Sequence, residues 1–194
     1  MARTQTRWLA IGGIAGPAAF VGAWVVGATR IPGYSMVDDA ISRLAAVRAP
    51  TRVLMTGGFV GFSVGVGAFS VALRDRLPGR AWMVAATTAA ATLGVAAFPL
   101  DHSSTVDTLH GAWATLGYVS LAATPLLAAG PLRAAGFPRA AVVSRGVAAF
   151  SAACLAGTVA GPAHGLFQRL GLSAADVWLA LAACAILTGR LNQA

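Results

Sequence analysis

The sequence predicts an all-α membrane protein: a bundle of six transmembrane helices with a short amphipathic helix in the first outer loop. Three observations support this prediction: a mean hydropathy of +0.73, only 10% charged residues in 194, and six long apolar runs. Soluble domains carry about 25% charged residues, and a spanning helix needs about 20 mostly apolar residues. We expect residues 1–194 to form a single integral-membrane domain.

The six apolar runs are separated by short loops that carry most of the charge. They cover residues 8–29, 53–73, 81–100, 110–132, 146–163 and 174–191. In the second run, Gly57, Gly61 and Gly65 recur every four residues. Small residues at this spacing let two membrane helices approach closely, so the pattern predicts tight packing along this face of the second helix.

The loop after the first run contains PGYSMVDDAISRLAAV at residues 32–47. Ser35 and Asp38 have the spacing of a capping box. Apolar residues then recur at helical spacing, at Val37, Ile41 and Leu44. This pattern indicates a short amphipathic helix, which we expect to lie at the membrane surface and cover the mouth of the bundle.

The adjacent acids of this loop have two interpretations. In the structural one, Asp38 caps the helix and Asp39 pairs with Arg43 one turn later, in the favourable acid-before-base order. In the functional one, the two acids lie side by side at an apolar boundary, where burial and like charge favour the protonated form of one carboxyl. A protonated carboxyl is a general acid.

The net charge of +8 comes from 14 Arg, with six Asp and neither Lys nor Glu. Because the Arg residues lie at the ends of apolar runs, they predict topology rather than binding to nucleic acid. One side would hold nine of them: Arg3, Arg7, Arg74, Arg76, Arg80, Arg133, Arg139, Arg145 and Arg190. The other would hold Arg30, Arg43, Arg48, Arg52 and Arg169. We expect a multi-pass protein of the cell membrane with both termini in the cytoplasm.

On this topology most acids, all three His and several aromatic residues fall on the outer side, including Asp176 at the start of the last run. Ionisable groups near membrane depth are costly and usually functional. The candidate catalytic residues are Asp38, Asp39, Asp107 and His110. The candidate substrate-binding residues are Trp24, Tyr34, Ser42, Trp113, His164 and Trp178.

Three kinds of chemistry fit such residues. The three His with Asp107 are sufficient in number to hold a metal, but their spacing matches no zinc signature such as HExxH, so we expect neither metal nor cofactor. Ser35 or Ser42 lacks the nucleophile elbow of a Ser-His-Asp enzyme. General acid chemistry fits better, because a protonated Asp can protonate an alkene or epoxide and aromatic faces stabilise the resulting carbocation.

Four stretches resemble a bacterial family of small six-helix membrane proteins that is labelled only as a domain of unknown function. They are PGYSMVDDAISRLAA, FPLD at residues 98–101, residues 107–110, and GPAHGLFQR at residues 161–169. This resemblance covers nearly the whole chain; it implies the fold and no activity. More loosely, the size, the helical membrane character and the acids near an apolar cavity look like the small membrane-bound terpene cyclases of actinobacteria, which implies cyclisation of prenylated compounds.

We therefore expect a membrane-embedded enzyme that acts on a lipophilic, isoprenoid-like small molecule. Asp38 or Asp39 would be the general acid, with Asp107 and His110 as the assisting pair or terminal base. The expected partners are this substrate and the lipid bilayer; the oligomeric state is open. The alternative is a non-enzymatic protein that binds a small molecule or lipid, or assists transport. A carrier would more often show internal repeats and polar residues at the midplane.

Overall fold

The computed structural model describes residues 2–191, and over these residues it is all-helical. Its elements are α1 (Ala2–Leu9), α2 (Gly12–Ala28), the 3-10 helix η1 (Ile41–Ala45), α3 (Arg52–Arg76), α4 (Ala81–Ala97), α5 (Ser104–Ala134), α6 (Pro138–Ala160) and α7 (His164–Leu187). Five segments are long and apolar enough to cross a membrane: Thr6–Ala28, which joins α1 to α2, and α3, α5, α6 and α7. With α4, a shorter apolar helix of 17 residues, they form a helical membrane bundle, as predicted.

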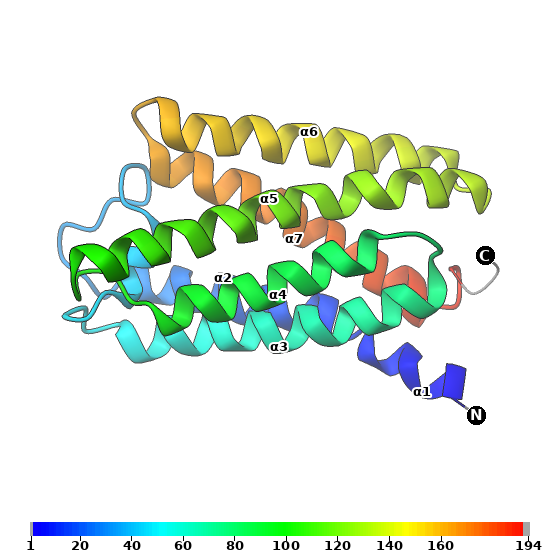
Figure 1. The fold of residues 1–194 in the computed structure, drawn as a ribbon, viewed down its shortest axis with the longest axis horizontal. Helices are drawn as coiled ribbons and strands as arrows, with labels where there is room; N and C mark the ends of the chain where they lie inside the picture. Colours follow the sequence, from blue (N-terminus) through cyan, green and yellow to red (C-terminus); the bar gives the residue numbers. More distant parts are fainter. Residues whose placement is uncertain (1, 192–194) are drawn as a thin grey trace.

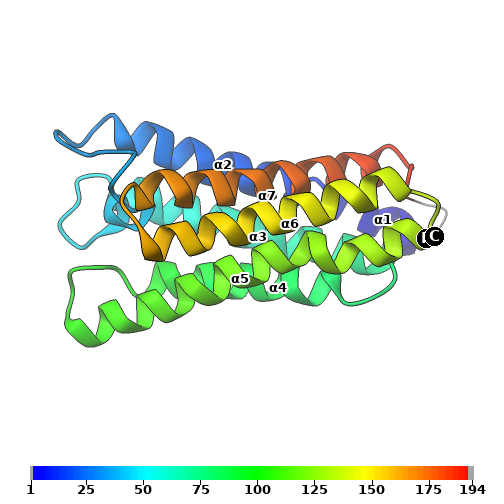
Figure 2. The same cartoon turned by 90° about the horizontal axis from the view of Figure 1, so that it is seen from above.

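From α2 to α7 the helices run along the length of the molecule and reverse direction at each connection (Figure 1). α1 and the end of α7 lie at one end of the bundle, which we call the terminal end (Figures 1 and 2). The loops at residues 29–51, 98–103 and 161–163 lie at the opposite end, which we call the loop end. Six helices that alternate in direction thus return the chain to the end where it started.

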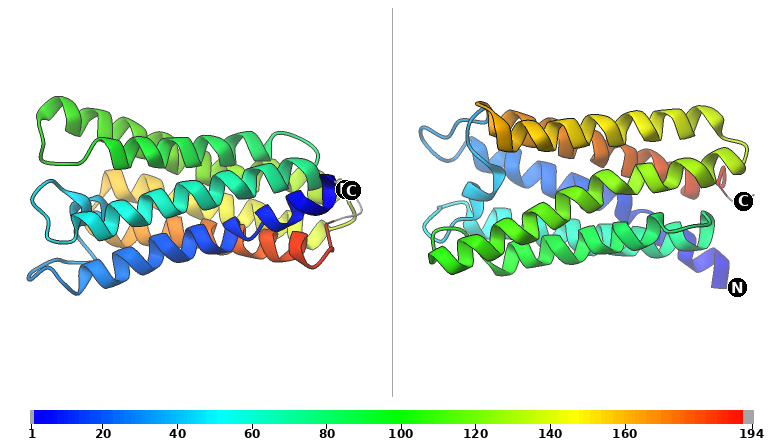
Figure 3. Two further views of the ribbon diagram at one scale, coloured as in Figure 1. Left: turned by 90° about the horizontal axis from the view of Figure 1, so that it is seen from below. Right: turned by 45° about the horizontal axis from the view of Figure 1, so that its top comes forward.

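Consecutive helices from α2 to α7 pack in turn, and α7 packs back against α2 (Figure 3). The bundle is therefore a closed ring of six helices. α7 also contacts α5 and α3 across the ring, which gives it the most central position. Three polar residues of α7, Gln168, Arg169 and Asp176, are consequently buried against protein.

α2 and α3 approach closely through glycines, as the four-residue repeat predicts. A Cβ on Gly65 would lie 2.6 Å from the Cα of Gly16, and one on Gly61 would lie 3.0 Å from Ala19 Cβ. A Cβ on Gly57 would meet nothing within 4 Å. The prediction of tight packing is confirmed at two of the three glycines, which face α2.

The helix predicted in the first outer loop is shorter than expected and is buried. Only η1 is helical, and its apolar residues Ile41 and Leu44 are 2% and 0% exposed. Ser35 and Asp38 do form the capping interaction, with the Asp38 N–H donating to Ser35 Oγ at 3.1 Å. That interaction closes a turn that precedes η1 and starts no helix.

Hydrogen bonds to other elements explain why the loop is not a longer helix. The N–H of Ile41 donates to Gln168 Oε1 on α7 at 2.7 Å, and the N–H of Val47 donates to the carbonyl of Leu100 at 3.0 Å. Ala40, directly before Ile41, is extended, with φ −64° and ψ 145°. Backbone groups satisfied by distant partners do not need a helix to satisfy them.

The last connection is shorter than the sequence suggests. We expected residues 164–173 to form a loop before the sixth span, whereas α7 begins at His164 and the connection is only residues 161–163. Two polar residues of this stretch, Gln168 and Arg169, are both 6% exposed inside the bundle. As a result Asp176 lies near the middle of α7 and not at its outer end.

Candidate functional site

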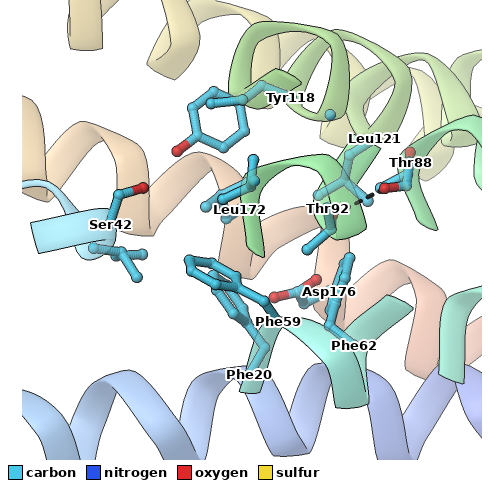
Figure 4. Close-up of a pocket in the computed structure, with 14 residues that line it drawn as sticks. Phe20, Ser42, Phe59, Phe62, Thr88, Thr92, Tyr118, Leu121, Leu172 and Asp176 are labelled. Atoms are coloured by element: carbon cyan, nitrogen blue, oxygen red, sulfur yellow. Dashed lines mark hydrogen bonds between the residues drawn. The ribbon is translucent and has the colours of Figure 1, made fainter. Parts of the chain in front are cut away.

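A pocket lies inside the ring, walled by α2, η1, α3, α4, α5 and α7 (Figure 4). Its lining is Phe20, Ile41, Ser42, Phe59, Phe62, Thr88, Thr92, Val95, Ala114, Gly117, Tyr118, Leu121, Leu172 and Asp176. Its volume is about 40 Å³, which holds about three water molecules. We call it the Asp176 pocket.

Asp176 places its carboxyl among apolar side chains of this pocket (Figure 4). The residue is 4% exposed, and both carboxyl oxygens are buried without a hydrogen-bond partner among the described residues. An unpaired carboxylate in such surroundings costs several kcal/mol, on the order of the penalty for an unpaired buried ion. Either a proton or the positive charge of a ligand must therefore neutralise it.

Three phenylalanines form the wall near this carboxyl. The Phe20 ring centroid lies 5.9 Å from that of Phe59 and 5.4 Å from that of Phe62. All three side chains are nearly buried, at 4–6% exposure. Aromatic faces attract positive charge, so this wall suits a cation that is bound or formed beside Asp176.

A chain of hydrogen bonds connects the pocket to its cover. The side-chain amide of Gln168 donates to the Tyr118 hydroxyl, and its oxygen accepts the Ile41 N–H. Tyr118, Ile41 and Ser42 all line the Asp176 pocket. The position of η1 over the pocket is thus fixed by α5 and α7.

Arg169 ties the remainder of the loop to α7. It is 6% exposed, and its Nη1 donates to the carbonyls of Met36 (2.8 Å), Asp39 (2.9 Å) and Gly165 (2.8 Å). Its Nη2 donates to the Tyr34 hydroxyl. Because Arg169 bonds both to loop carbonyls, those of Met36 and Asp39, and to the Gly165 carbonyl on α7, it holds the loop over the end of the bundle.

The aromatic residues of the loop end complete this arrangement. The Arg169 guanidinium carbon lies 5.3 Å from the Trp24 ring centroid and 5.6 Å from that of Tyr34. Burial raises the pKa of Tyr34 above its ordinary value of 10.0, so the phenol keeps its proton at neutral pH and donates to the Ala40 carbonyl at 3.1 Å. We call Arg169, Trp24, Tyr34 and the carbonyls of Met36 and Asp39 the Arg169 clamp.

The acids predicted in the first loop contact Ser35. Asp38 is exposed and accepts from Ser35 Oγ at 2.8 Å. Asp39 is half-buried and accepts from the Ser35 N–H at 2.8 Å. Arg43, one turn after Asp39, pairs with Asp101 at 3.2 Å. Of the two parts of the structural interpretation, the Ser35–Asp38 interaction is present, whereas the predicted Asp39–Arg43 pair is wrong, because Arg43 pairs with Asp101 instead.

The other two predicted catalytic residues lie at the start of α5. Asp107 accepts the Asp101 N–H at 2.9 Å. His110 is 4% exposed; its Nδ1 lies 2.6 Å from the Phe98 carbonyl, and its buried Nε2 has no partner among the described residues. No hydrogen bond within residues 2–191 joins either residue to Asp38 or Asp39.

The predicted substrate-binding residues are distributed over five places. Ser42 is the one that lines the Asp176 pocket, and Trp24 and Tyr34 belong to the Arg169 clamp. Trp113 packs against Gly94 of α4, and His164 is exposed, with its Nδ1 3.0 Å from the Gly161 carbonyl. Trp178 is buried on α7, where its Nε1 donates to Ser144 Oγ at 2.8 Å.

Asp176 and Arg169 were not among the predicted site residues. The signal was present, because each is a charged residue within a long apolar stretch, where such residues are rare and usually functional. Because the sequence prediction began the last helix at residue 174, it placed Arg169 and Asp176 at the surface of the bundle instead of inside it. Among the described residues, no three His, Cys, Asp or Glu side chains are grouped as metal ligands.

The fold and this interior carboxyl define a class: a multi-helix membrane protein with a polar site inside its bundle. Residues 14–185 match the family described as "Protein of unknown function (DUF998)". The match covers most of the chain, which therefore belongs to this family, in agreement with the resemblance noted from its sequence. No curated protein and no solved structure matches the chain.

Proposed function

We propose that this protein is a membrane-embedded enzyme that acts on a lipophilic, isoprenoid-like molecule in the Asp176 pocket, with Asp176 as the general acid. The observation that supports this is the pair of unpartnered Asp176 oxygens facing three phenylalanines. A neutral carboxyl supplies the proton, and the aromatic wall stabilises the positive charge that results.

The proposed reaction is an isomerisation of the terpene-cyclase kind. The Asp176 O–H bond breaks while the π electrons of a substrate alkene form a new C–H bond, which leaves a carbocation on the neighbouring carbon. A second π bond of the same chain attacks this carbon and closes a ring. Loss of a proton to the Asp176 carboxylate forms the final alkene and restores the acid.

The cover of the pocket is the part that must move. A cavity of about 40 Å³ is smaller than the pockets of about 300–1,000 Å³ that enclose small molecules. Unlike the spanning helices, η1 is a five-residue element held by one hydrogen bond to Gln168 and by the adjacent Arg169 clamp. We propose that η1 lifts to admit substrate and that its return excludes water from the cation.

We also place the terminal end of the bundle in the cytoplasm, with the Asp176 pocket nearer the outer leaflet. The arginine distribution supports this orientation, because nine arginines are expected at the terminal end and five at the loop end, and the side richer in arginine faces the cytoplasm. The predicted partners are the lipophilic substrate and the bilayer.

The test compares three carboxyls in one assay. Purified protein in detergent is incubated with farnesyl and geranylgeranyl compounds that end in an alkene or an epoxide, and cyclised isomers are identified by chromatography and mass spectrometry. Asp176→Asn is expected to reduce turnover by about 10²-fold or more. Asp38→Asn and Asp39→Asn, the matched controls, are expected to change it only a few-fold, within about 1 kcal/mol.

The opposite outcome is informative. Loss of turnover in Asp38→Asn or Asp39→Asn, with full activity in Asp176→Asn, would restore the acid predicted from the sequence and reject Asp176. His110→Ala and Asp107→Asn in the same assay test the predicted assisting pair. Thermal unfolding of each variant separates loss of chemistry from loss of fold, and Asn at position 176 keeps the side-chain shape.

A non-enzymatic small-molecule-binding or transport-accessory protein is the second candidate. The position of Asp176 near the middle of α7 favours it, because transport proteins hold charged ligands near the membrane midplane. Titration with tetraphenylphosphonium, a lipophilic cation, tests this. Binding that weakens about tenfold in Asp176→Asn, with no turnover of any prenyl compound, would favour this second function.

A further inference from the structure

A second hollow lies at the terminal end, the end of the bundle opposite to the clamp. α6 and α7 meet at residues 161–163 and separate toward the terminal end (Figure 1). A groove with a volume of about 400 Å³ opens there. It is lined by Leu73, Leu77, Leu132, Phe137, Ala140, Val143, Ser144, Trp178, Leu181, Ala182, Ala185, Arg190 and Leu191. We call it the terminal groove.

The interior of this groove is apolar and requires an apolar occupant. Its two polar side chains away from the rim satisfy each other, since Trp178 Nε1 donates to Ser144 Oγ and Ser144 Oγ donates to the Ala140 carbonyl. Val143 and Leu181 on its edges are 56% and 62% exposed. In a bilayer these edges face acyl chains.

The end of the bundle at which the groove opens is basic. Arg190 belongs to its lining, and Arg74, Arg80, Arg133 and Arg139 lie at the same end of the bundle. Of the six Asp, all of which lie within the described residues, Asp75 alone is at this end. Basic pockets between membrane helices attract anionic lipid headgroups.

We propose that the terminal groove is a binding site for an anionic phospholipid, which places one acyl chain along the apolar lining and its phosphate against Arg190. Charge complementarity favours an anionic headgroup, and the volume and apolar character of the lining favour an acyl chain. The proposal is independent of the function of the Asp176 pocket, which lies on another part of the ring.

The experiment uses the full chain, purified in detergent, with dioleoyl-phosphatidylglycerol and dioleoyl-phosphatidylcholine as probes. Native mass spectrometry counts bound lipid over a titration of each. Wild-type protein is expected to bind phosphatidylglycerol at least about fivefold more tightly than phosphatidylcholine. One arginine near an anionic headgroup contributes a free energy of this size. Arg190→Gln should remove this preference while binding of phosphatidylcholine continues.

Two further variants make the test specific. Arg80→Gln removes an exposed positive charge at the same end but outside the groove, so it should leave the preference unchanged. Ala140→Trp fills the groove from an exposed position, so it should abolish binding of both lipids without unfolding the protein. Equal losses in Arg80→Gln and Arg190→Gln would reduce the effect to general surface charge and overturn the proposal. Detection of a dimer of this chain that Ala140→Trp dissociates would also overturn the proposal.

Discussion

Two charged side chains of α7, seven residues apart, have opposite surroundings. The two Nη groups of Arg169 donate to three carbonyls and a phenol and only its Nε lacks a partner, whereas neither oxygen of Asp176 has a partner among the described residues. Buried polar groups are normally hydrogen-bonded, and exceptions require an explanation. Arg169 therefore acts in the structure of the loop, and Asp176 is the residue that requires a functional explanation.

Replacing Arg169 by Lys tests the clamp. Lys keeps the charge but lacks the planar fork that reaches Met36, Asp39 and Tyr34 together. We expect the free energy of unfolding to fall by about 1–3 kcal/mol, with faster proteolysis within residues 34–41. Arg48→Lys, an exposed position in the same loop, should change stability by less than about 0.5 kcal/mol. Equal effects of the two substitutions would contradict a clamp.

The residue scale is also where prediction from sequence was weakest. The chemistry of the expected site was stated as an acid beside aromatic groups, and Ser42 does line the pocket. The acid that faces the pocket, Asp176, was placed at the outer end of the last span, because residues 164–173 were expected to be a connection. The partners of the buried polar residues in that stretch are some 130 positions away, as for Arg169 and Met36, and no local pattern reveals them.

At the scale of elements, the packing of α2 on α3 follows directly from sequence spacing. The glycine repeat predicts close approach, and the glycines that face α2 are in contact with it. The short helix in the loop was harder to predict, because its length depends on backbone N–H groups that donate to Gln168 on α7 and to the carbonyl of Leu100. Spacing within a segment predicts which face packs; it does not predict which distant groups will satisfy the backbone.

Two glycines of α3 provide a matched test of this packing. Gly65→Ala places a methyl group 2.6 Å from the Gly16 Cα, so the helices must separate, and we expect a loss of about 1–3 kcal/mol. Gly57→Ala meets open space and should be neutral or stabilising by up to about 1 kcal/mol, because Ala favours helix over Gly. Thermal unfolding in detergent measures both. A neutral Gly65→Ala would show that the α2–α3 contact is looser than described.

At the scale of the whole molecule, an even number of passes returns the chain to its starting end (Figure 1). Apolar run lengths alone predicted this arrangement, since membrane thickness sets the length of each helix. The run lengths do not say which end faces the cytoplasm. That depends on the arginines, which favour the terminal end by nine to five.

A reporter fused after Ala194 tests the orientation. We expect green fluorescent protein to fluoresce there and alkaline phosphatase to be inactive, because the side richer in arginine remains in the cytoplasm. Fusions in the loop at residues 161–163 should give the reverse pattern. An active phosphatase after Ala194 would invert the bundle and place the Asp176 pocket nearer the inner leaflet.

The buried charges of α7 also bear on how the protein is made. A charged residue at the centre of a lone helix opposes insertion into the bilayer by about 2.5–3.5 kcal/mol. α7 is the last of the described helices to leave the ribosome, so the carbonyls that receive Arg169 and the phenylalanines around Asp176 have already been synthesised. The insertion of α7 can therefore be assisted by the helices before it, and its dependence on them is a constraint on the order of biogenesis.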